Sequence, residues 1–454
     1  MIDYNKALEK LRLIDQQDLL KYWQELNPSE QQKLLDDIEQ LDLKLFYKQQ
    51  ALLDLLDSPF NTITPVTKWE QAGNKERKEA GKQLVAQGKV GCIIVAGGQG
   101  TRLKFEGPKG LFPISPIKGK TLFQLFAEKI IAAGKQANRA LPVAIMTSVY
   151  NAKTTKDYFQ EHNFFGLASD QLDFFNQGSL PFLNDIRDLF LETKSSIAKG
   201  PDGNGSIYQT FVESGLCQKW KNQGVSYVNI VLIDNPLADP FDFELVALHA
   251  AKKAEVTIKA CPKAAPDENV GVLAMSHDRI IVKEYSELSE NDKKALEEQG
   301  GVPFGLANLS LYCMNLEFFD RVATKLHIKL PLHKAFKSAP YLSKDGKSVV
   351  SKEPNAWKFE KYIFDTLFYS NRTEILVYPR NQCFAPLKNF EGSNSPETVK
   401  EALLQSYRDV FSEVTGIPAN STPFEISQQF YYPTEELMQK WKGKTKPSGE
   451  YIEA

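Results

Sequence analysis

Residues 90–109 read VGCIIVAGGQGTRLKFEGPK and form the stretch that decides the fold. The apolar run Cys92–Val95 has the composition of a buried strand, and it leads directly into a glycine-rich turn. Glycines at the end of a parallel strand let backbone N–H groups approach a phosphate without a Cβ in the way. Arg102 and Lys109 add the positive charge that a polyphosphate requires. The stretch therefore predicts a phosphate-binding loop rather than a plain turn with spare glycines.

Two common nucleotide-binding motifs do not fit this loop. A dinucleotide fingerprint needs a third glycine where the chain has Leu103, which disfavours a dehydrogenase. A Walker A loop ending at residues 119–121 would need a glycine at the position of Ile114. The glycines therefore indicate another class of phosphate site.

Apolar segments of strand length recur through the middle of the chain and alternate with helical patterns. The predicted strands are 90–96, 143–147, 227–233, 256–260, 270–275 and 306–314, with a short one at 375–378. The predicted helices are 121–133, 207–221, 241–251, 397–411 and 435–441. Continuous apolar strands that alternate with helices favour a sheet covered on both faces. We therefore predict an α/β fold with a mixed, mostly parallel sheet.

The first 57 residues are predicted to be wholly helical. Ser29 and Gln32 have the spacing of a capping box, with Ser29 as the N-cap. An apolar stripe at helical spacing follows, formed by Leu34, Leu35, Ile38, Leu41 and Leu45. Such a stripe favours a helix that faces the core of its own chain over a partner-binding helix. The proline-containing stretch 58–67 predicts a connector.

The composition limits what the 454-residue chain can be. Its length suggests two or three domains, and 55 basic against 57 acidic residues argue against a general nucleic-acid binder. Five scattered cysteines without a CxxC pair predict neither a disulfide framework nor a zinc site. The first 25 residues are too charged for a signal peptide, and no apolar run reaches the ~18 residues of a membrane span. We expect a cytoplasmic protein with no nucleic-acid or membrane partner.

The glycine-rich loop and six later motifs resemble the UDP-sugar pyrophosphorylases, most closely the eukaryotic-type UDP-N-acetylglucosamine pyrophosphorylases. AGGQGTRL with Pro108-Lys109-Gly110 is the first motif. The others, in the family's order, are NQGSLP (176–181), PDGNG (201–205), IDN (233–235), KEYSE (283–287), KFEKYIFD (358–365) and FAPLKN (384–389). The resemblance covers roughly residues 85–410.

The resemblance implies an enzyme that transfers a uridylyl group from UTP to a hexose 1-phosphate and releases pyrophosphate, with Mg²⁺ as cofactor. N-acetylglucosamine 1-phosphate is the first acceptor it suggests. Glucose 1-phosphate or a broad range of hexose 1-phosphates stays open, as does a catalytically silent nucleotide-sugar binder. The implied organisation is an N-terminal helical region (1–60), a Rossmann-like nucleotidyltransferase domain (85–370) and a small C-terminal α+β domain (375–454). A monomer or a homodimer is expected.

The resemblance also assigns roles to individual positions. The nucleotide-binding residues are Ala96, Gly97, Gly98, Gln99, Lys109, Gln177, Gly203 and Lys358. The sugar-binding residues are Asn204, Gly271, Glu284, Tyr285, Asn308 and Lys388. Arg102, Lys109 and Lys388 are the catalytic cations, and Asp234 is the metal ligand.

The residues themselves support some of these roles only in part. Asp234 ends a predicted buried strand, where α/β sheets bind ligands, but it could equally be a turn residue before Asn235-Pro236. The chain departs from the family at Lys104, where glycine is common, at Tyr362, where phenylalanine is frequent, and in the residues that follow Asn308.

Overall fold

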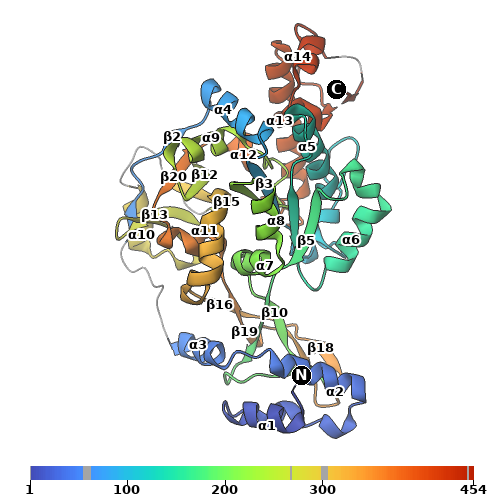
Figure 1. Ribbon diagram of the computed structural model, residues 1–454, viewed down its shortest axis with the longest axis vertical. Helices are drawn as coiled ribbons and strands as arrows, with labels where there is room; N and C mark the ends of the chain where they lie inside the picture. The colour runs from blue at the N-terminus through green and yellow to red at the C-terminus, as the bar shows by residue number, and fades with distance from the viewer. Residues whose placement is uncertain (1, 55–62, 266–267, 298–304, 447–448) are drawn as a thin grey trace. The chain divides into compact units, whose positions relative to one another are not determined.

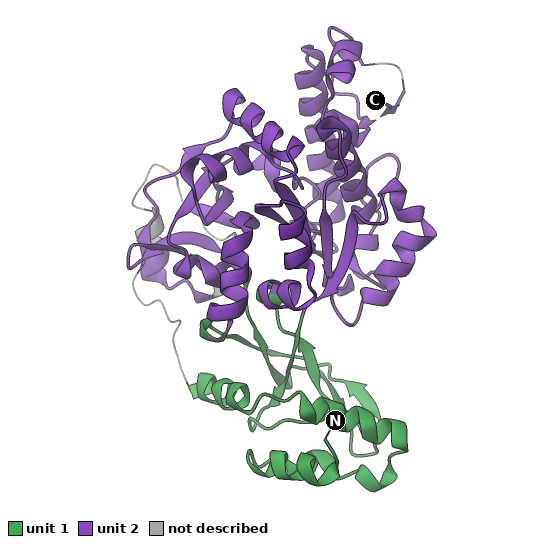
Figure 2. Ribbon diagram, in the orientation of Figure 1, with its two compact units in different colours: residues 1–61, 178–206, 329–362 green, residues 62–177, 207–328, 363–454 purple. Residues whose placement is uncertain are grey.

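The structure, a computed structural model, describes residues 2–54, 63–265, 268–297, 305–446 and 449–454 (Figure 1). The chain forms two compact units, each assembled from three separate segments (Figure 2). Unit 1 comprises residues 1–61, 178–206 and 329–362, and unit 2 comprises residues 62–177, 207–328 and 363–454. The sequence predicts three consecutive domains, and that division stays a prediction. The two compact units of the structure are discontinuous in the sequence.

A sheet of eleven described strands organises unit 2. Its main path runs β2 (Glu70–Gln71), β20 (Thr373–Val377), β12 (Val256–Pro262), β15 (Leu306–Asn315), β11 (Tyr227–Leu232), β3 (Val90–Val95), β4 (Val143–Thr147) and β5 (Leu172–Asn176). Neighbours pair in parallel except at β15, which is antiparallel to both β11 and β12. Three further strands branch from this path, namely β1 (Thr64–Pro65), β13 (Val272–Ser276) and β14 (Arg279–Lys283). The predicted mixed, mostly parallel sheet is confirmed.

Helices cover both faces of this sheet (Figure 1). Cys92 and Ile94 of β3 share a buried cluster with Phe126 of α5 (Leu122–Ala137). On the opposite face of β3, a Cβ added to Gly91 would lie 2.5 Å from the indole ring of Trp220 in α8 (Leu216–Asn222), so the ring packs directly on the strand backbone. The other helices of unit 2 are α4 (Lys75–Ala86), α6 (Ala152–Glu161), α7 (Ile207–Glu213), α9 (Phe243–Lys252), α10 (Glu290–Glu297), α11 (Leu316–Arg321), α12 (Arg380–Cys383), α13 (Pro396–Thr415) and α14 (Glu435–Trp441). Burial on both faces explains why the strands are continuous apolar runs.

Near the C-terminus, β21 (Glu425–Ile426) pairs in parallel with β22 (Tyr451–Ile452). Phe411 of α13 packs there against the rings of Phe424 and Trp441. The aromatic contacts join Phe424 and α14 to α13, and the strand pairing holds the last described residues against β21.

Unit 1 combines three helices with short strand pairs. The helices are α1 (Tyr4–Arg12), α2 (Pro28–Glu39) and α3 (Leu43–Asp54). The strands are β6 (Ser179–Pro181), β7 (Leu183–Asn184), β8 (Leu191–Thr193), β9 (Ser196–Ile197), β10 (Lys199–Pro201), β16 (His333–Lys337), β17 (Pro340–Leu342), β18 (Ser348–Val350) and β19 (Ala356–Glu360). Leu11 and Leu34 are buried in one cluster with Leu183, Leu332 and Phe359. The predicted apolar stripe therefore faces the core of its own chain.

Two local predictions were wrong. Asn27, not Ser29, caps α2, because its side chain accepts from the N–H of Glu30 and the Glu30 carboxylate accepts from the N–H of Asn27. The helix expected at 207–221 is two helices, because Gly215 adopts a left-handed conformation (φ 79°) between α7 and α8. The connector predicted at 58–67 lies outside the described residues up to position 62, and its described end contains β1.

Within the described ranges, no helix is both long and apolar enough to cross a membrane. All five cysteines are free and buried. The cytoplasmic location stays a prediction.

His249 in α9 gives the fold a specific sensitivity to acid. Its ring is fully buried, with Nε2 3.0 Å from Asn315 Oδ1 and Nδ1 3.0 Å from Thr257 Oγ1. Because an amide oxygen only accepts, Nε2 carries the proton and the Thr257 hydroxyl donates to Nδ1. Burial lowers the pKa of His249 from 6.5 to about 4.

This pKa shift predicts how stability changes with pH. Between pH 6.5 and 4 the unfolded chain binds a proton at position 249 that the folded chain does not, so the free energy of unfolding falls as the pH falls. Through this one group, the free energy of unfolding is lower by about 3 kcal/mol at pH 4 than at neutral pH. Urea titrations across this range are expected to show a shallower decline for His249→Gln than for the wild type, while His162→Gln, at an exposed histidine, keeps the wild-type slope. Equal slopes for all three proteins would contradict the assignment.

Candidate active site

The site begins where β3 ends and the glycine-rich loop turns back on itself. The N–H of Ala96 still donates to Met146 O in β4 at 2.8 Å, and the loop then leaves the sheet. The N–H of Lys109 donates to Gly98 O at 3.1 Å, and the N–H of Gly100 donates to Gly107 O at 2.9 Å. These bonds fold the loop into a closed turn that brings Lys109 next to the end of the strand.

The side chain of Asn151 stabilises the start of this loop. Its side chain is buried, its Nδ2 donates to Ala96 O at 3.0 Å, and its Oδ1 accepts from the N–H of Ser148 at 2.8 Å. Sequence reasoning missed this residue. In the sequence, a lone asparagine just before a helix indicates only a helix cap, and nothing there shows that its amide reaches a carbonyl 55 residues away.

Gln177 lies against the same loop. Its N–H donates to Thr147 O at 2.8 Å at the end of β4, and its side chain is nearly buried. A Cβ placed on Gly97 would lie 2.3 Å from Gln177 Oε1. Glycine at position 97 therefore gives the amide of Gln177 the space it occupies. The two predicted nucleotide-binding residues are in direct contact.

Asp234 joins the loop from the neighbouring strand. β3 and β11 pair in parallel, so the residues that follow them emerge at the same edge of the sheet. From β3 the chain builds β4 and β5 on one side, and it places β11 on the other, so this edge is the point where the strand order reverses. Lys109 Nζ lies 3.4 Å from Asp234 Oδ2, and the two side chains are 17% and 15% exposed. A cation and a carboxylate thus meet at the position where such sheets bind ligands.

The segment that carries Lys388 is bonded to the same strand end. The N–H of Leu387 donates to Asp234 O at 2.7 Å. Asn235 donates from Nδ2 to Cys383 O at 2.8 Å and accepts the N–H of Ala385 at 3.1 Å. Three hydrogen bonds therefore connect residues 383–387 to the end of β11. Lys388 directly follows Leu387, whose N–H is bonded to the Asp234 carbonyl.

Lys129 holds the turn after Asp234 from the other direction. Its side chain is buried in α5, and its Nζ donates to Pro236 O at 2.7 Å and to Ala238 O at 3.0 Å. Burial lowers the pKa of Lys129 to about 8. This role was not predictable from the sequence, since Lys129 stands in an ordinary amphipathic helix.

Lys104 has a backbone conformation that suits the glycine expected at its position. Its backbone is left-handed, with φ 52° and ψ 35°, which glycine adopts most easily. In this chain the Lys104 ammonium lies 4.0 Å from the ring centroid of Phe390, two residues beyond Lys388. This cation–π contact connects the glycine-rich loop with the Lys388 segment. Arg102 is exposed on the same loop.

Three of the predicted sugar-binding residues of unit 2 lie together at Gly271. The N–H of Asn308 donates to Gly271 O at 2.8 Å, and a Cβ on Gly271 would lie 2.9 Å from Glu284 Oε1. Asn308 is buried and Tyr285 is exposed. The structure therefore brings Gly271, Glu284 and Asn308 together.

The remaining predicted residues belong to unit 1. Gly203 adopts φ +87°, and a Cβ there would lie 2.3 Å from Lys361 O. Asn204 follows it in the short helical turn 204–206. Lys358 Nζ pairs with Glu360 Oε1 at 2.9 Å on β19. Gly203, Asn204 and Lys358 are thus carried by a different compact unit from Asp234 and Lys109.

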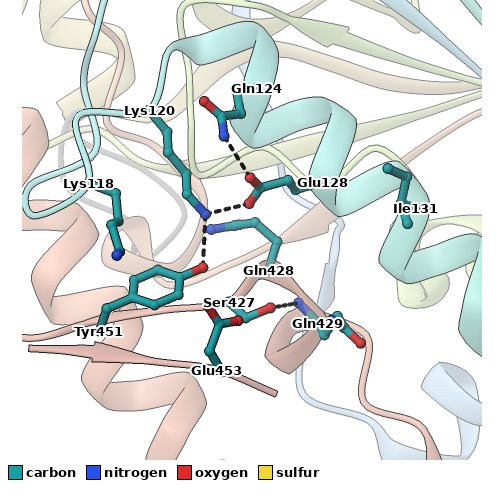
Figure 3. Close-up of a pocket in the computed structure, with 10 residues that line it drawn as sticks. All are labelled: Lys118, Lys120, Gln124, Glu128, Ile131, Ser427, Gln428, Gln429, Tyr451 and Glu453. Carbon is teal, nitrogen blue, oxygen red and sulfur yellow. Dashed lines mark hydrogen bonds and ion pairs between the residues drawn. The ribbon is translucent and has the colours of Figure 1, made fainter. Parts of the chain in front are cut away.

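A cavity of about 360 Å³ lies elsewhere in unit 2, between α5 and the C-terminal segment (Figure 3). Figure 3 shows that Lys120 donates to Glu128 and to the Tyr451 hydroxyl, at 2.7 and 2.9 Å. A second cavity of about 660 Å³ contains Asp242 and Lys259, whose carboxylate and ammonium are 2.6 Å apart. Neither cavity includes any residue predicted to bind substrate.

The donor set at the strand ends fits one kind of metal ion. No group of three or more His, Cys, Asp or Glu side chains that could hold a metal occurs among the described residues. Mg²⁺ is commonly bound by one or two carboxylates together with phosphate oxygens and water. The partly exposed carboxylate of Asp234, placed beside the glycine-rich loop, fits that requirement.

Comparisons with known proteins agree with this geometry. The family model described as UTP–glucose-1-phosphate uridylyltransferase matches residues 54–420. UDP-N-acetylglucosamine diphosphorylase 2 of Arabidopsis thaliana is 31% identical over 97% of this chain and 92% of its own length. UDP-N-acetylglucosamine pyrophosphorylase of Saccharomyces cerevisiae is 32% identical over 94% of this chain and 95% of its own length.

Two solved structures share the architecture. A chain from Entamoeba histolytica, named as a UDP-N-acetylglucosamine pyrophosphorylase, has a TM-score of 0.75 and 27% identity, over 86% of this chain and 100% of that one. The UDP-N-acetylglucosamine pyrophosphorylase of Trypanosoma brucei, solved with an inhibitor, covers 100% of this chain and 98% of that one with a TM-score of 0.81, and at 22% identity it supports the fold. Since the family model spans most of the sequence and the relatives align almost end to end, the chain belongs to the UTP–glucose-1-phosphate uridylyltransferase family.

Proposed function

We propose that this uridylyltransferase transfers UMP from UTP to N-acetylglucosamine 1-phosphate and releases pyrophosphate. The main supporting observation is the convergence of Lys109, Asp234 and the Lys388 segment on the glycine-rich loop. The two relatives above, named for UDP-N-acetylglucosamine, support the choice of sugar. We further propose a cytoplasmic enzyme that acts as a monomer or a homodimer.

The residues divide the work between binding and charge neutralisation. The loop residues Gly97 to Gln99 offer backbone N–H groups to the triphosphate, while Ala96, whose N–H donates to Met146 O, lines the site next to them. Gln177 contacts uracil, since its amide can both donate and accept. Glu284 and Asn308 bind sugar hydroxyls, and Gly271 leaves room for the Glu284 carboxylate. Gly203, Asn204 and Lys358 belong to unit 1, and their nucleotide and sugar roles remain those that the resemblance implies. Tyr285 is proposed to contact the sugar.

The reaction needs no covalent nucleophile from the protein. A phosphate oxygen of the sugar 1-phosphate attacks the α-phosphorus of UTP, and the bond to the leaving pyrophosphate breaks on the opposite side. Lys109, Arg102 and Lys388 neutralise the phosphates, whose mutual repulsion otherwise keeps the two anions apart. Asp234 would hold Mg²⁺, which when bound supplies positive charge to the phosphate oxygens.

Pyrophosphate release with UTP and Mg²⁺ tests this function. The 1-phosphates of N-acetylglucosamine, N-acetylgalactosamine, glucose and galactose are supplied one at a time, and N-acetylglucosamine 1-phosphate is expected to give the highest kcat/KM. A preference for glucose 1-phosphate would overturn the choice of sugar and keep the reaction. A folded protein that binds UTP but releases no pyrophosphate with any sugar would be a silent nucleotide-sugar binder instead.

A further inference from the structure

Asn308 is held by contacts from the segment that directly follows it. Its side chain is 7% exposed, and its Oδ1 lies 2.8 Å from the Tyr312 hydroxyl and 3.2 Å from the backbone N of Ser310. Its Nδ2 lies 3.4 Å from Ser310 Oγ. Both partners come from the segment that follows Asn308, where the sequence differs from N-acetylglucosamine enzymes.

The backbone contact fixes which way the amide points. An N–H group can only donate, so the amide atom that faces Ser310 N must be the oxygen. The Tyr312 hydroxyl then donates to the same oxygen, because an amide oxygen only accepts. Asn308 Oδ1 therefore already accepts two hydrogen bonds from the protein. Nδ2 has two hydrogens, and Ser310 Oγ accepts one of them.

Tyr312 is a dependable donor in this position. Its side chain is 1% exposed, and burial raises its pKa well above the usual value, so the phenol keeps its proton over the whole neutral range. The ring is part of the sheet interior on β15, and its hydroxyl faces the side chains of Asn308 and Ser310.

Ser310 reaches Asn308 only because β15 is bulged. The pairing with β12 shifts between Lys259 and Ala260, which face Leu311 and Asn308, so two residues of β15 are inserted there. Ser310, one of the two, has φ +54°, a conformation that a non-glycine residue rarely adopts. Backbone strain of this kind occurs most often where a site requires a particular geometry.

We propose that Tyr312 and Ser310 are positioning residues that lock the Asn308 amide so that it presents an N–H donor to an oxygen of the sugar. The contact selects an acceptor atom, a hydroxyl or acetamido oxygen, at that position of the hexose. This inference rests on the proposed function, because it assumes that a sugar 1-phosphate binds beside Asn308. It adds two residues that the family motifs do not include.

Steady-state kinetics of Tyr312→Phe test the proposal. The variant keeps the ring and loses the hydroxyl, so the amide can rotate. We expect KM for the preferred sugar 1-phosphate to rise about tenfold while KM for UTP stays unchanged. Asn308→Asp replaces the donor with an acceptor and keeps the shape, and it should raise the sugar KM about 100-fold. Ser310→Gly keeps the backbone N–H and suits the positive φ but removes the Oγ acceptor, so the sugar KM should rise less than in Tyr312→Phe, by about threefold.

Tyr431→Phe serves as the matched control. It removes a tyrosine hydroxyl that shares a 2.7 Å hydrogen bond with Ser406 Oγ, away from the sugar-binding residues. It should lower the unfolding temperature about as much as Tyr312→Phe without changing either KM. A sugar KM for Tyr312→Phe within twofold of the wild type, or an equal rise in both KM values, would overturn the inference alone. A wild-type protein that turns over no sugar would instead overturn the proposed function, and the inference with it.

Discussion

Asp234→Asn is expected to lower kcat for pyrophosphate release by about 1000-fold at saturating UTP and Mg²⁺. The substitution keeps the size of the side chain but removes the charge proposed to hold the metal ion and paired with Lys109 at 3.4 Å. It leaves the backbone bond from Leu387 N to Asp234 O intact, so residues 383–388 should keep their place. The unfolding temperature should therefore stay close to that of the wild type.

Asp320→Asn is the control for this variant. Asp320 also pairs with a lysine, Lys221, at 2.6 Å, and it lies outside the proposed site. Its loss should change kcat by less than twofold. Activity of Asp234→Asn within tenfold of the wild type would rule out a metal role for this carboxylate. A large loss that is partly restored by Mg²⁺ above the concentration that saturates the wild type would support that role directly.

Lys388→Met is expected to lower kcat about 100-fold and to raise either KM by no more than about threefold. Methionine fills the space of the lysine stem without the charge. If the ammonium interacts mainly with charge that develops during phosphoryl transfer, its loss affects the transition state more than substrate binding. The measurement is a full kinetic analysis at varied UTP and sugar 1-phosphate.

Lys400→Met, at an exposed lysine on α13, provides the comparison for Lys388→Met. It should behave as the wild type in both kcat and KM. A Lys388 variant with wild-type kcat and a strongly raised KM would make Lys388 a binding residue that acts equally in the ground state and the transition state.

The sequence predicted seven of the eleven described strands of the sheet, because their apolar runs are local patterns, and β4 has the predicted bounds 143–147. The strands β1, β2, β5 and β14 were not predicted. Outside the sheet, α14 has the predicted bounds 435–441. The strand direction of β15 was not predictable in the same way. Its apolar run is compatible with either pairing, and the antiparallel contacts with β11 and β12 depend on the path of the chain around them.

The candidate site was predictable where a motif places a functional side chain next to a glycine or at a strand end. Gly97 with Gln177, and Lys109 with Asp234, are in contact in the structure. Asn151, Lys129 and Tyr312 were not predictable. Each of them binds an atom that only folding brings near. Asn151 and Lys129 donate to backbone carbonyls of other segments, and Tyr312 donates to the Asn308 amide, whose orientation depends on a bulge.

The discontinuous build of unit 1 affects how the newly made chain folds on the ribosome. The buried faces of α1 and α2 include Leu11 and Leu34, and Phe359 of the same cluster is synthesised about 325–350 residues later. At about 5–20 residues per second, the N-terminal helices wait for about 16–70 s before this residue is made. During that interval their apolar faces are the kind of surface that chaperones bind.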